Sequence, residues 1–247
     1  MFSPDGQKAL IALDDSTART FEVESGLNEH IFRPQRGEAS RRMHLTSVLP
    51  PSLSCAVFSP GDARWLLTTA SGPSVQLLDA ETGTCLRTFQ NSGYAMNSAV
   101  FSPDGSRVVT TSWEGTVRIY YPATGVCERT FMLGCGRDQL VDIPRHAEFS
   151  ADQARLLVLL DRSHVEILDA ETGDFMVGLE DHGEFVVNCS FSSDGRKVLT
   201  SSLTTVRIYD AESGKCQWAH ECEDLSTTVF SSSCFCHGVH SARDEDN

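Results

Sequence analysis

Two apolar and turn-forming signals recur along the chain at a constant spacing. The first is the dipeptide Phe-Ser, followed by a turn-forming tripeptide: Pro-Asp-Gly after Phe2 and Phe101, Pro-Gly-Asp after Phe58, Ala-Asp-Gln after Phe149 and Ser-Asp-Gly after Phe191. The second is a downstream turn of the form acidic-small-Gly, and the distance from Phe to this Gly is always 23 to 25 residues. Self-similarity of this kind indicates one structural unit repeated five times. The five pairs are Phe2 and Gly26, Phe58 and Gly83, Phe101 and Gly125, Phe149 and Gly173, and Phe191 and Gly214.

Within each unit the pattern predicts antiparallel strands joined by tight turns. Ser-Pro-Asp-Gly favours a turn because Pro fixes φ, Asp hydrogen-bonds its own backbone and Gly accepts positive φ. A compact apolar run such as 156–160 follows, which is typical of a strand covered on both sides. The next run alternates, as in Val117 and Ile119 with Arg118 between them. No segment has a sustained helical period, so the sequence predicts an all-β fold.

These features resemble the WD40 repeat family. The stretches beginning Phe101-Ser-Pro-Asp-Gly and Gly115-Thr-Val-Arg-Ile-Tyr match that repeat nearly position by position. The resemblance implies a β-propeller, in which four-stranded sheets, or blades, surround a channel and each innermost strand ends at Phe-Ser. We expect a propeller over 1–230 and a disordered tail over 231–247. The repeats are predicted near 1–34, 53–90, 95–133, 145–180 and 185–220, with a sixth begun at 226–230.

Departures from the family pattern predict looser blades. The Trp-Asp dipeptide is closest to its family form at Tyr209-Asp210, and only His182 stands where the family's His would lie. Asp15 keeps the acid of the turn between the second and third strands, with Glu114 as a near substitute. No repeat holds the complete hydrogen-bonded set of His, hydroxyl, Trp and Asp. We therefore expect blades less stable than the family norm.

The number of repeats leaves ring closure open. Propellers of this family usually resemble rings of about seven blades. The chain is therefore a fragment of a longer propeller, an open arc, or a closed five-bladed ring in which 226–230 supplies the innermost strand of the first blade. We favour a fragment or an open arc. Unpaired strand edges in such an arc predict edge-mediated self-association.

Charge and composition exclude several classes of function. The net charge of −14 argues against general nucleic-acid binding, which needs clustered Lys and Arg. No apolar run approaches the roughly 18 residues that a membrane span needs, so we expect no membrane insertion. We expect no export signal, and we read the nine cysteines as reduced thiols. These readings predict a cytoplasmic or nuclear protein.

The residues that suggest a catalytic or a metal site have simpler structural explanations. Cys234, Cys236, His237 and His240 lie close enough in sequence to suggest zinc. Their crowding, beyond the last recognisable strand, favours a frayed end. No nucleophile with a base, carboxylate pair or phosphate loop stands out, because turn chemistry explains the recurring acids. We predict no metal site, no cofactor and no enzyme activity.

The resemblance places partner binding on one rim of the propeller, where the connections from fourth to first strands meet the turns between second and third strands. Trp113 is typical of a hot-spot residue, although packing against a neighbouring blade explains it equally well. The basic loop 33–42 suggests an acidic or phosphorylated partner, but a solvated loop is the simpler interpretation.

The sequence predicts a non-catalytic scaffold that binds proteins or peptides. The alternatives are a sensor or regulatory repeat segment of a larger signalling protein, and a propeller enzyme. The candidate partner-binding residues are Trp113, Tyr94, Arg137, Asp138, Arg162, Asp181, His182 and Leu203.

Overall fold

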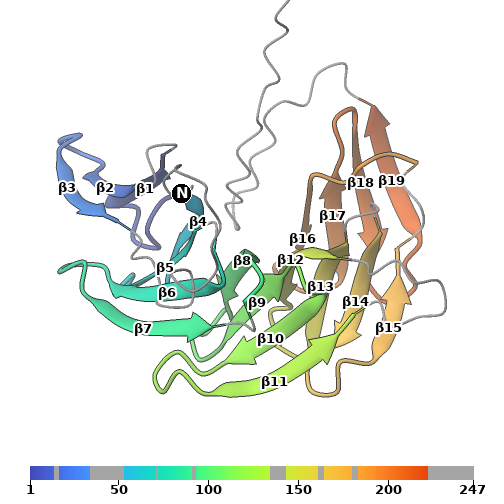
Figure 1. The fold of residues 1–247 in the computed structure, drawn as a ribbon. Helices are drawn as coiled ribbons and strands as arrows, with labels where there is room; N and C mark the ends of the chain where they lie inside the picture. The colour runs from blue at the N-terminus through green and yellow to red at the C-terminus, as the bar shows by residue number, and fades with distance from the viewer. Residues whose placement is uncertain are drawn as a thin grey trace, which may run out of the picture.

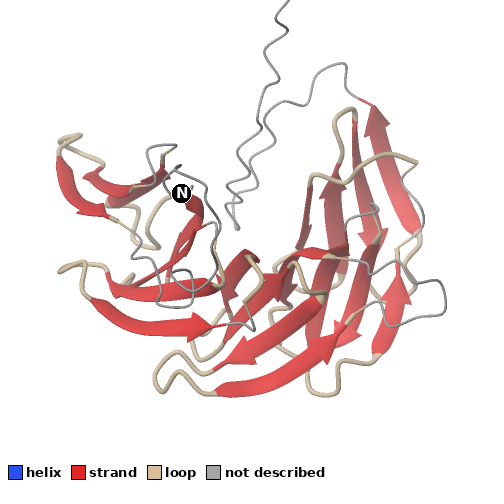
Figure 2. Cartoon of the chain, viewed as in Figure 1, coloured by secondary structure: helices blue, strands red, loops and turns tan. Residues whose placement is uncertain are grey.

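The computed structural model describes most of the chain as β-strands joined by short turns. It describes residues 1–13, 17–33, 53–70, 72–90, 93–133, 143–160, 164–179 and 183–221. Within these ranges the chain forms 19 strands and no helix (Figure 2). The predicted all-β fold is confirmed.

The strands form five antiparallel sheets in chain order, which we call blades 1 to 5. In each complete blade the strands are a, b, c and d, from the innermost strand outward. Blade 1 has strands b to d: β1 (Lys8–Ala12), β2 (Ala18–Glu22) and β3 (Asn28–Phe32). Blade 2 has β4 (Leu53–Phe58), β5 (Trp65–Ala70), β6 (Ser74–Asp79) and β7 (Cys85–Gln90). Blade 3 has β8 (Met96–Phe101), β9 (Val108–Ser112), β10 (Thr116–Tyr120) and β11 (Cys127–Met132). Blade 4 has β12 (Pro144–Phe149), β13 (Arg155–Leu160), β14 (Val165–Asp169) and β15 (Phe175–Gly178). Blade 5 has β16 (Asn188–Phe191), β17 (Lys197–Ser201), β18 (Thr205–Asp210) and β19 (Cys216–Glu221).

The five blades follow one another along an arc that does not close (Figure 1). Blade 1 lies at one end of the arc and blade 5 at the other, with blade 3 at the base between them. A closed five-bladed ring, one of the sequence-based alternatives, is therefore not the observed arrangement. The segment 226–230, which that alternative needed, lies outside the described residues, as does the predicted tail 231–247.

The turns form as the sequence predicts. In the a–b turn of blade 3, the Ser102 hydroxyl donates to Asp104 at 2.6 Å and accepts from the Arg107 backbone N–H at 2.9 Å. In the c–d turn of blade 4, the Asp169 carboxylate accepts from the backbone N–H groups of Glu171 and Thr172 at 2.9 and 2.8 Å. These backbone donors lower the pKa of Asp169. The recurring acids are thus turn-stabilising residues.

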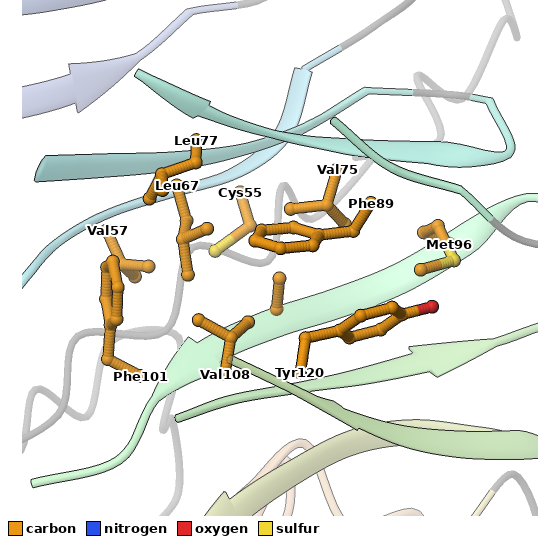
Figure 3. Close-up of a cluster of buried hydrophobic side chains, with 11 residues drawn as sticks. Cys55, Val57, Leu67, Val75, Leu77, Phe89, Met96, Phe101, Val108 and Tyr120 are labelled. Atoms are coloured by element: carbon orange, nitrogen blue, oxygen red, sulfur yellow. The ribbon is translucent and has the colours of Figure 1, made fainter. Parts of the chain in front are cut away.

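The hydrophobic core lies between blades rather than at one centre. Between blades 2 and 3, Leu67, Leu77 and Phe89 of one sheet pack against Val108 and Tyr120 of the next (Figure 3). The Phe89 and Tyr120 rings are tilted, with centroids 5.0 Å apart. Similar clusters join blade 1 to 2, blade 3 to 4 and blade 4 to 5. Each blade therefore holds its neighbour, and the loops at the two rims are carried by a continuous packed scaffold.

Candidate binding rim

The order of strands divides the loops between two rims. One rim carries the b–c turns and the d–a connections, and we call it the Trp113 rim. The opposite rim carries the a–b turns and the c–d turns, and we call it the glycine-turn rim. The structure describes three of the eight sequence-predicted residues, and these lie on the Trp113 rim: Tyr94, Trp113 and Leu203.

In blade 3 a polar network holds the b–c turn that carries Trp113. The Glu114 carboxylate accepts from the Thr116 hydroxyl at 3.0 Å and from the Arg118 guanidinium at 2.8 Å. The hydroxyls of Ser112 and Thr116 lie 2.8 Å apart. This partly buried network ties the b–c turn to the first residues of strand c. Glu114 therefore acts as the turn-stabilising acid, as the sequence suggested.

The same turn brings Trp113 beside Tyr94. The backbone N–H of Trp113 donates to the Ala95 carbonyl at 3.0 Å, so the turn is tied to the connection that contains Tyr94. The Tyr94 and Trp113 side chains remain 57% and 56% exposed. This exposure favours the hot-spot interpretation of Trp113 over packing against a neighbouring blade. Blade 3 thus presents two aromatic side chains to solvent from a fixed backbone.

Blade 5 repeats this arrangement with different residues. The Glu184 carboxylate accepts from the hydroxyls of Ser202 and Thr204 at 2.7 and 2.8 Å, and these bonds lower its pKa. The Ser202 and Thr205 hydroxyls lie 2.8 Å apart beneath the turn. Leu203 sits on this turn and is 64% exposed. Glu184 therefore fixes the d–a connection to the b–c turn of the blade.

Sequence reasoning missed Phe185, the residue beside Glu184. Its side chain is 68% exposed on the same connection, although the following Val186 is buried. The signal was an aromatic residue in the otherwise polar stretch 181–185. Phe185 was overlooked because the resemblance to the family pointed to His182 in the same stretch. Phe185 and Leu203 form the apolar pair of blade 5, as Tyr94 and Trp113 form that of blade 3.

Several other sequence-predicted residues lie outside the described residues. On the predicted rim these are Arg137, Asp138, Arg162, Asp181 and His182. The basic loop beyond Arg33 and the Cys/His stretch 234–240 also lie outside them. Their assignments stay predictions.

A hollow of 440 Å³ opens on the glycine-turn rim between blades 2 and 3. Its lining includes Trp65, Arg64 and the acids Asp62 and Asp104. Both acids are engaged in their own turns: Asp62 accepts from the Arg64 backbone N–H at 3.1 Å, and Asp104 accepts from Ser102. The hollow lies where the a–b turns of blades 2 and 3 meet, and these turns account for the acids in its lining. Nothing in its lining matches the paired apolar side chains of the Trp113 rim.

The described residues hold neither a cluster of metal ligands nor a helix that could cross a membrane. Among them, no three His, Cys, Asp or Glu side chains gather closely enough to hold a metal ion. The described part of the chain also contains no helix of the length and apolarity that a membrane crossing requires.

Comparison with known families decides the identity of the repeat. The model of the family "WD domain, G-beta repeat" matches residues 83–121 and 173–210. These two segments are WD40 repeats. Each matched WD40 segment runs from strand d of one blade through strands a, b and c of the next, so one sequence repeat spans a blade junction. The WD40 repeat therefore links neighbouring sheets covalently at every junction it covers.

Two known proteins align with parts of this chain. The chain is 26% identical over 223 residues to Apoptotic protease-activating factor 1 of Mus musculus, covering 90% of this chain and 16% of that protein. It is 31% identical over 81 residues to WD repeat and SOCS box-containing protein 1 of Takifugu rubripes, covering 30% of this chain and 19% of that protein. The chain thus spans less than a fifth of the length of either relative.

Proposed function

We propose that this chain is a non-catalytic scaffold that binds a protein or peptide on the Trp113 rim. The observation that carries the proposal is the pair of exposed apolar side chains on each of two blades, Tyr94 with Trp113 and Phe185 with Leu203. Each pair stands on a turn fixed by a polar network. Aromatic side chains held in this way bind with little loss of conformational entropy, which is why they dominate interface hot spots.

The arrangement of the two pairs favours an extended or multi-point ligand. They lie on blades 3 and 5 of one arc. In the sequence, Arg137 and Asp138 come between β11 and β12, and Arg162 comes between β13 and β14 of the intervening blade 4. We include these residues in the proposed surface as polar partners around apolar anchors. The mechanism is geometric: stacked sheets hold the loops, and the anchors insert into the partner.

A random peptide library displayed on phage, panned against the whole chain, tests this proposal. Enriched peptides are then synthesised, and their affinities are compared for the native chain, Trp113→Ala and Leu203→Ala. We expect the affinity to fall at least about 30-fold in Trp113→Ala, since a hot-spot side chain contributes about 2 kcal/mol or more. Both variants change exposed side chains, so the fold should persist.

Phe175→Ala provides the matched control, because Phe175 is equally exposed but follows a c–d turn on the glycine-turn rim. Its peptide affinity should equal that of the native chain. Peptides that bind all three variants with native affinity would contradict the proposal.

A second candidate function rests on the relationship to Apoptotic protease-activating factor 1. That protein is named for the activation of an apoptotic protease, and this chain aligns with a region amounting to 16% of its length. A repeat region within a larger signalling protein would act as a sensor or regulatory segment, in which the same rim receives the signal. Fusion of the chain to a reporter that is active only when unbound would separate this regulatory role from simple tethering.

We also propose a cytoplasmic or nuclear location. The described cysteines Cys55, Cys85, Cys127, Cys189 and Cys216 are free thiols, which suits a reducing compartment. Fractionation of cells that express the chain tests the location.

A further inference from the structure

Each blade has two faces with distinct repeat positions. The leading face packs on the following blade and the trailing face packs on the preceding one. The leading positions of blades 1 to 4 include, in chain order, Leu10, Leu67, Val109 and Leu157. The trailing positions include the Phe of each Phe-Ser, which are Phe58, Phe101, Phe149 and Phe191. Two faces of the arc have no neighbour within the described residues: the leading face of blade 5 and the trailing face of blade 1 (Figure 1).

The leading face of blade 5 is apolar, and no further blade packs on it within the described residues. Leu199, Val206 and Ile208 occupy the positions at which blade 4 has Leu157, Val165 and Ile167. The three blade 4 residues are buried between blades 4 and 5, whereas the three blade 5 residues are only half-buried. On strand d, Trp218 is cross-strand from Ile208 and about half exposed, with its ring stacked on His220. The leading face of blade 5 therefore has the apolar composition of a face that packs on a following blade, but no following blade is present within the described residues.

The trailing face of blade 1 shows the complementary pattern. Phe2 occupies the position of Phe58, Phe101, Phe149 and Phe191 and is 62% exposed, whereas the other four are at most 8% exposed. Phe21, equivalent to the buried Tyr120, is half-buried, and Val23, equivalent to the buried Ala170, is exposed. The apolar side chains that elsewhere lie against a preceding blade are exposed to solvent here.

The contacts at the outer end of each junction support the same conclusion. A Cβ at Gly173 would overlap the Phe131 ring of the preceding blade, and a Cβ at Gly214 would overlap the Gly178 carbonyl. At Gly26, the equivalent glycine of blade 1, nothing lies within 4 Å. The cleft that a preceding outer strand fills at the other blades is open at blade 1.

A cation–aromatic contact recurs at the inner end of the junctions. The Arg107 guanidinium of blade 3 lies 5.4 Å from the centre of the Phe149 ring, and that of Arg155 in blade 4 lies 5.4 Å from the Phe191 ring. Lys197 begins strand b of blade 5 at the same repeat position. Its matching aromatic residue would be the Phe of a Phe-Ser at the start of a further blade, and Phe2 is the uncovered one among the described residues.

We propose that copies of this chain join head to tail, with the leading face of blade 5 in one copy packing on the trailing face of blade 1 in a second copy. The four junctions inside the chain specify what each face binds: a leading face binds a trailing face. Blades 1 and 5 stand at opposite ends of the arc, so each copy offers both halves to others (Figure 1). Lys197 of one copy lies against Phe2 of the next, and Trp218 against the open site at Gly26. Such a contact is heterologous and extends beyond a dimer. It differs from the edge pairing that the sequence predicted, which stays a prediction.

Sedimentation velocity on the 247-residue chain between about 1 and 100 µM tests the proposal. The native chain should show an average mass that rises with concentration to at least about twice the 27.1 kDa of one copy. Trp218→Glu disables the blade 5 face, and Phe2→Glu disables the blade 1 face. Each variant alone should stay at the mass of one copy. Both positions are exposed, and circular dichroism with thermal melting confirms that the variants are folded.

Mixing the two variants provides the decisive measurement, because together they retain one intact leading face and one intact trailing face. The mixture should form a one-to-one dimer and nothing larger. Phe175→Glu, at an exposed aromatic on blade 4, serves as the control and should associate like the native chain. A native chain of one-copy mass at all concentrations would overturn the proposal. So would loss of association in only one of the two variants, which indicates pairing of like faces, or a mixture that fails to associate.

Discussion

The junction between blades 2 and 3 and the junction between blades 4 and 5 have the same plan but different chemistry at one repeat position. Val57, cross-strand from Leu67, faces blade 3 from the innermost strand of blade 2. The equivalent residue of blade 4 is Glu148, cross-strand from Leu157. Glu148 is buried, and its carboxyl accepts from the backbone N–H of Phe191 in blade 5 at 2.5 Å. One junction is wholly apolar at this point, and the other contains an acid.

The difference shows how this packing tolerates a buried carboxyl. Burial raises the pKa of Glu148 to about 8, despite the hydrogen bond from Phe191, which favours the charged form. Glu148 is therefore largely neutral at neutral pH. Cys189 lies nearby in blade 5, and its thiol pKa is also raised, first by burial and then by Glu148. The acid is accommodated by taking up a proton from solvent rather than by burying a charge.

The largest effect is expected from breaking the apolar junction. Phe89→Ala removes a buried ring that packs against Tyr120 and leaves a cavity between blades 2 and 3. We expect the free energy of unfolding to fall by about 3–5 kcal/mol. Urea denaturation followed by tryptophan fluorescence measures this loss. Phe175→Ala, an exposed aromatic, should change it by less than about 0.5 kcal/mol. A similar small change in Phe89→Ala would show that the junction is not a close-packed core.

The second effect concerns the acidic junction and its dependence on pH. Glu148 is protonated up to about pH 8 in the folded chain, but in the unfolded chain it loses its proton near its ordinary pKa of 4.5. Between these values the folded state holds more protons, so the free energy of unfolding falls as the pH rises. We expect Glu148 to contribute a fall of about 2–4 kcal/mol between about pH 5 and pH 8. Urea titrations at several pH values measure it.

Glu148→Gln isolates this contribution from the other titrating groups. The amide oxygen can still accept from the Phe191 N–H, but the side chain no longer titrates. The difference in unfolding free energy between the native chain and Glu148→Gln should therefore change with pH, in favour of the native chain at low pH. A difference that stays constant across the interval between the two pKa values would contradict the assignment of a raised pKa.

The sequence predicted the features that repeat and missed those that break the repeat. The Phe-Ser and Gly positions identified the strands and turns because the same turn chemistry recurs at a fixed distance. Glu148 was overlooked, although it stands where blades 2 and 3 have Val57 and Val100. Alternation placed Arg118 on a second face of its strand without showing that this face is also covered, and Gln76, at the equivalent position of blade 2, is buried. The period of a strand reports which residues share a face, but not what packs on that face.

The rim was less predictable than the blades. The position of Trp113 followed from topology, but its exposure depended on how the turn is tied to Ala95, a contact that no spacing reveals. Phe185 was missed because sequence reasoning followed the family's histidine. Loops carry few periodic constraints, and their side-chain directions depend on individual hydrogen bonds such as those of Glu184.

The smallest expected effect on the free energy of unfolding concerns one glycine at the outer end of each of the two junctions, between blades 2 and 3 and between blades 4 and 5. Gly125 of blade 3 and Gly214 of blade 5 hold the same turn position, with φ of +77° and +71°. An alanine at either position must adopt a left-handed backbone, which costs about 1–2 kcal/mol. A Cβ at Gly125 would lie 3.5 Å from the flexible Arg87 side chain, an ordinary contact. At Gly214 it would overlap the backbone carbonyl of Gly178, so blades 4 and 5 would have to separate. We therefore expect Gly214→Ala to lower the free energy of unfolding by about 1–2 kcal/mol more than Gly125→Ala, as measured by paired urea titrations. Equal losses would mean that only the turn conformation matters and that blades 4 and 5 are no closer at this point than blades 2 and 3.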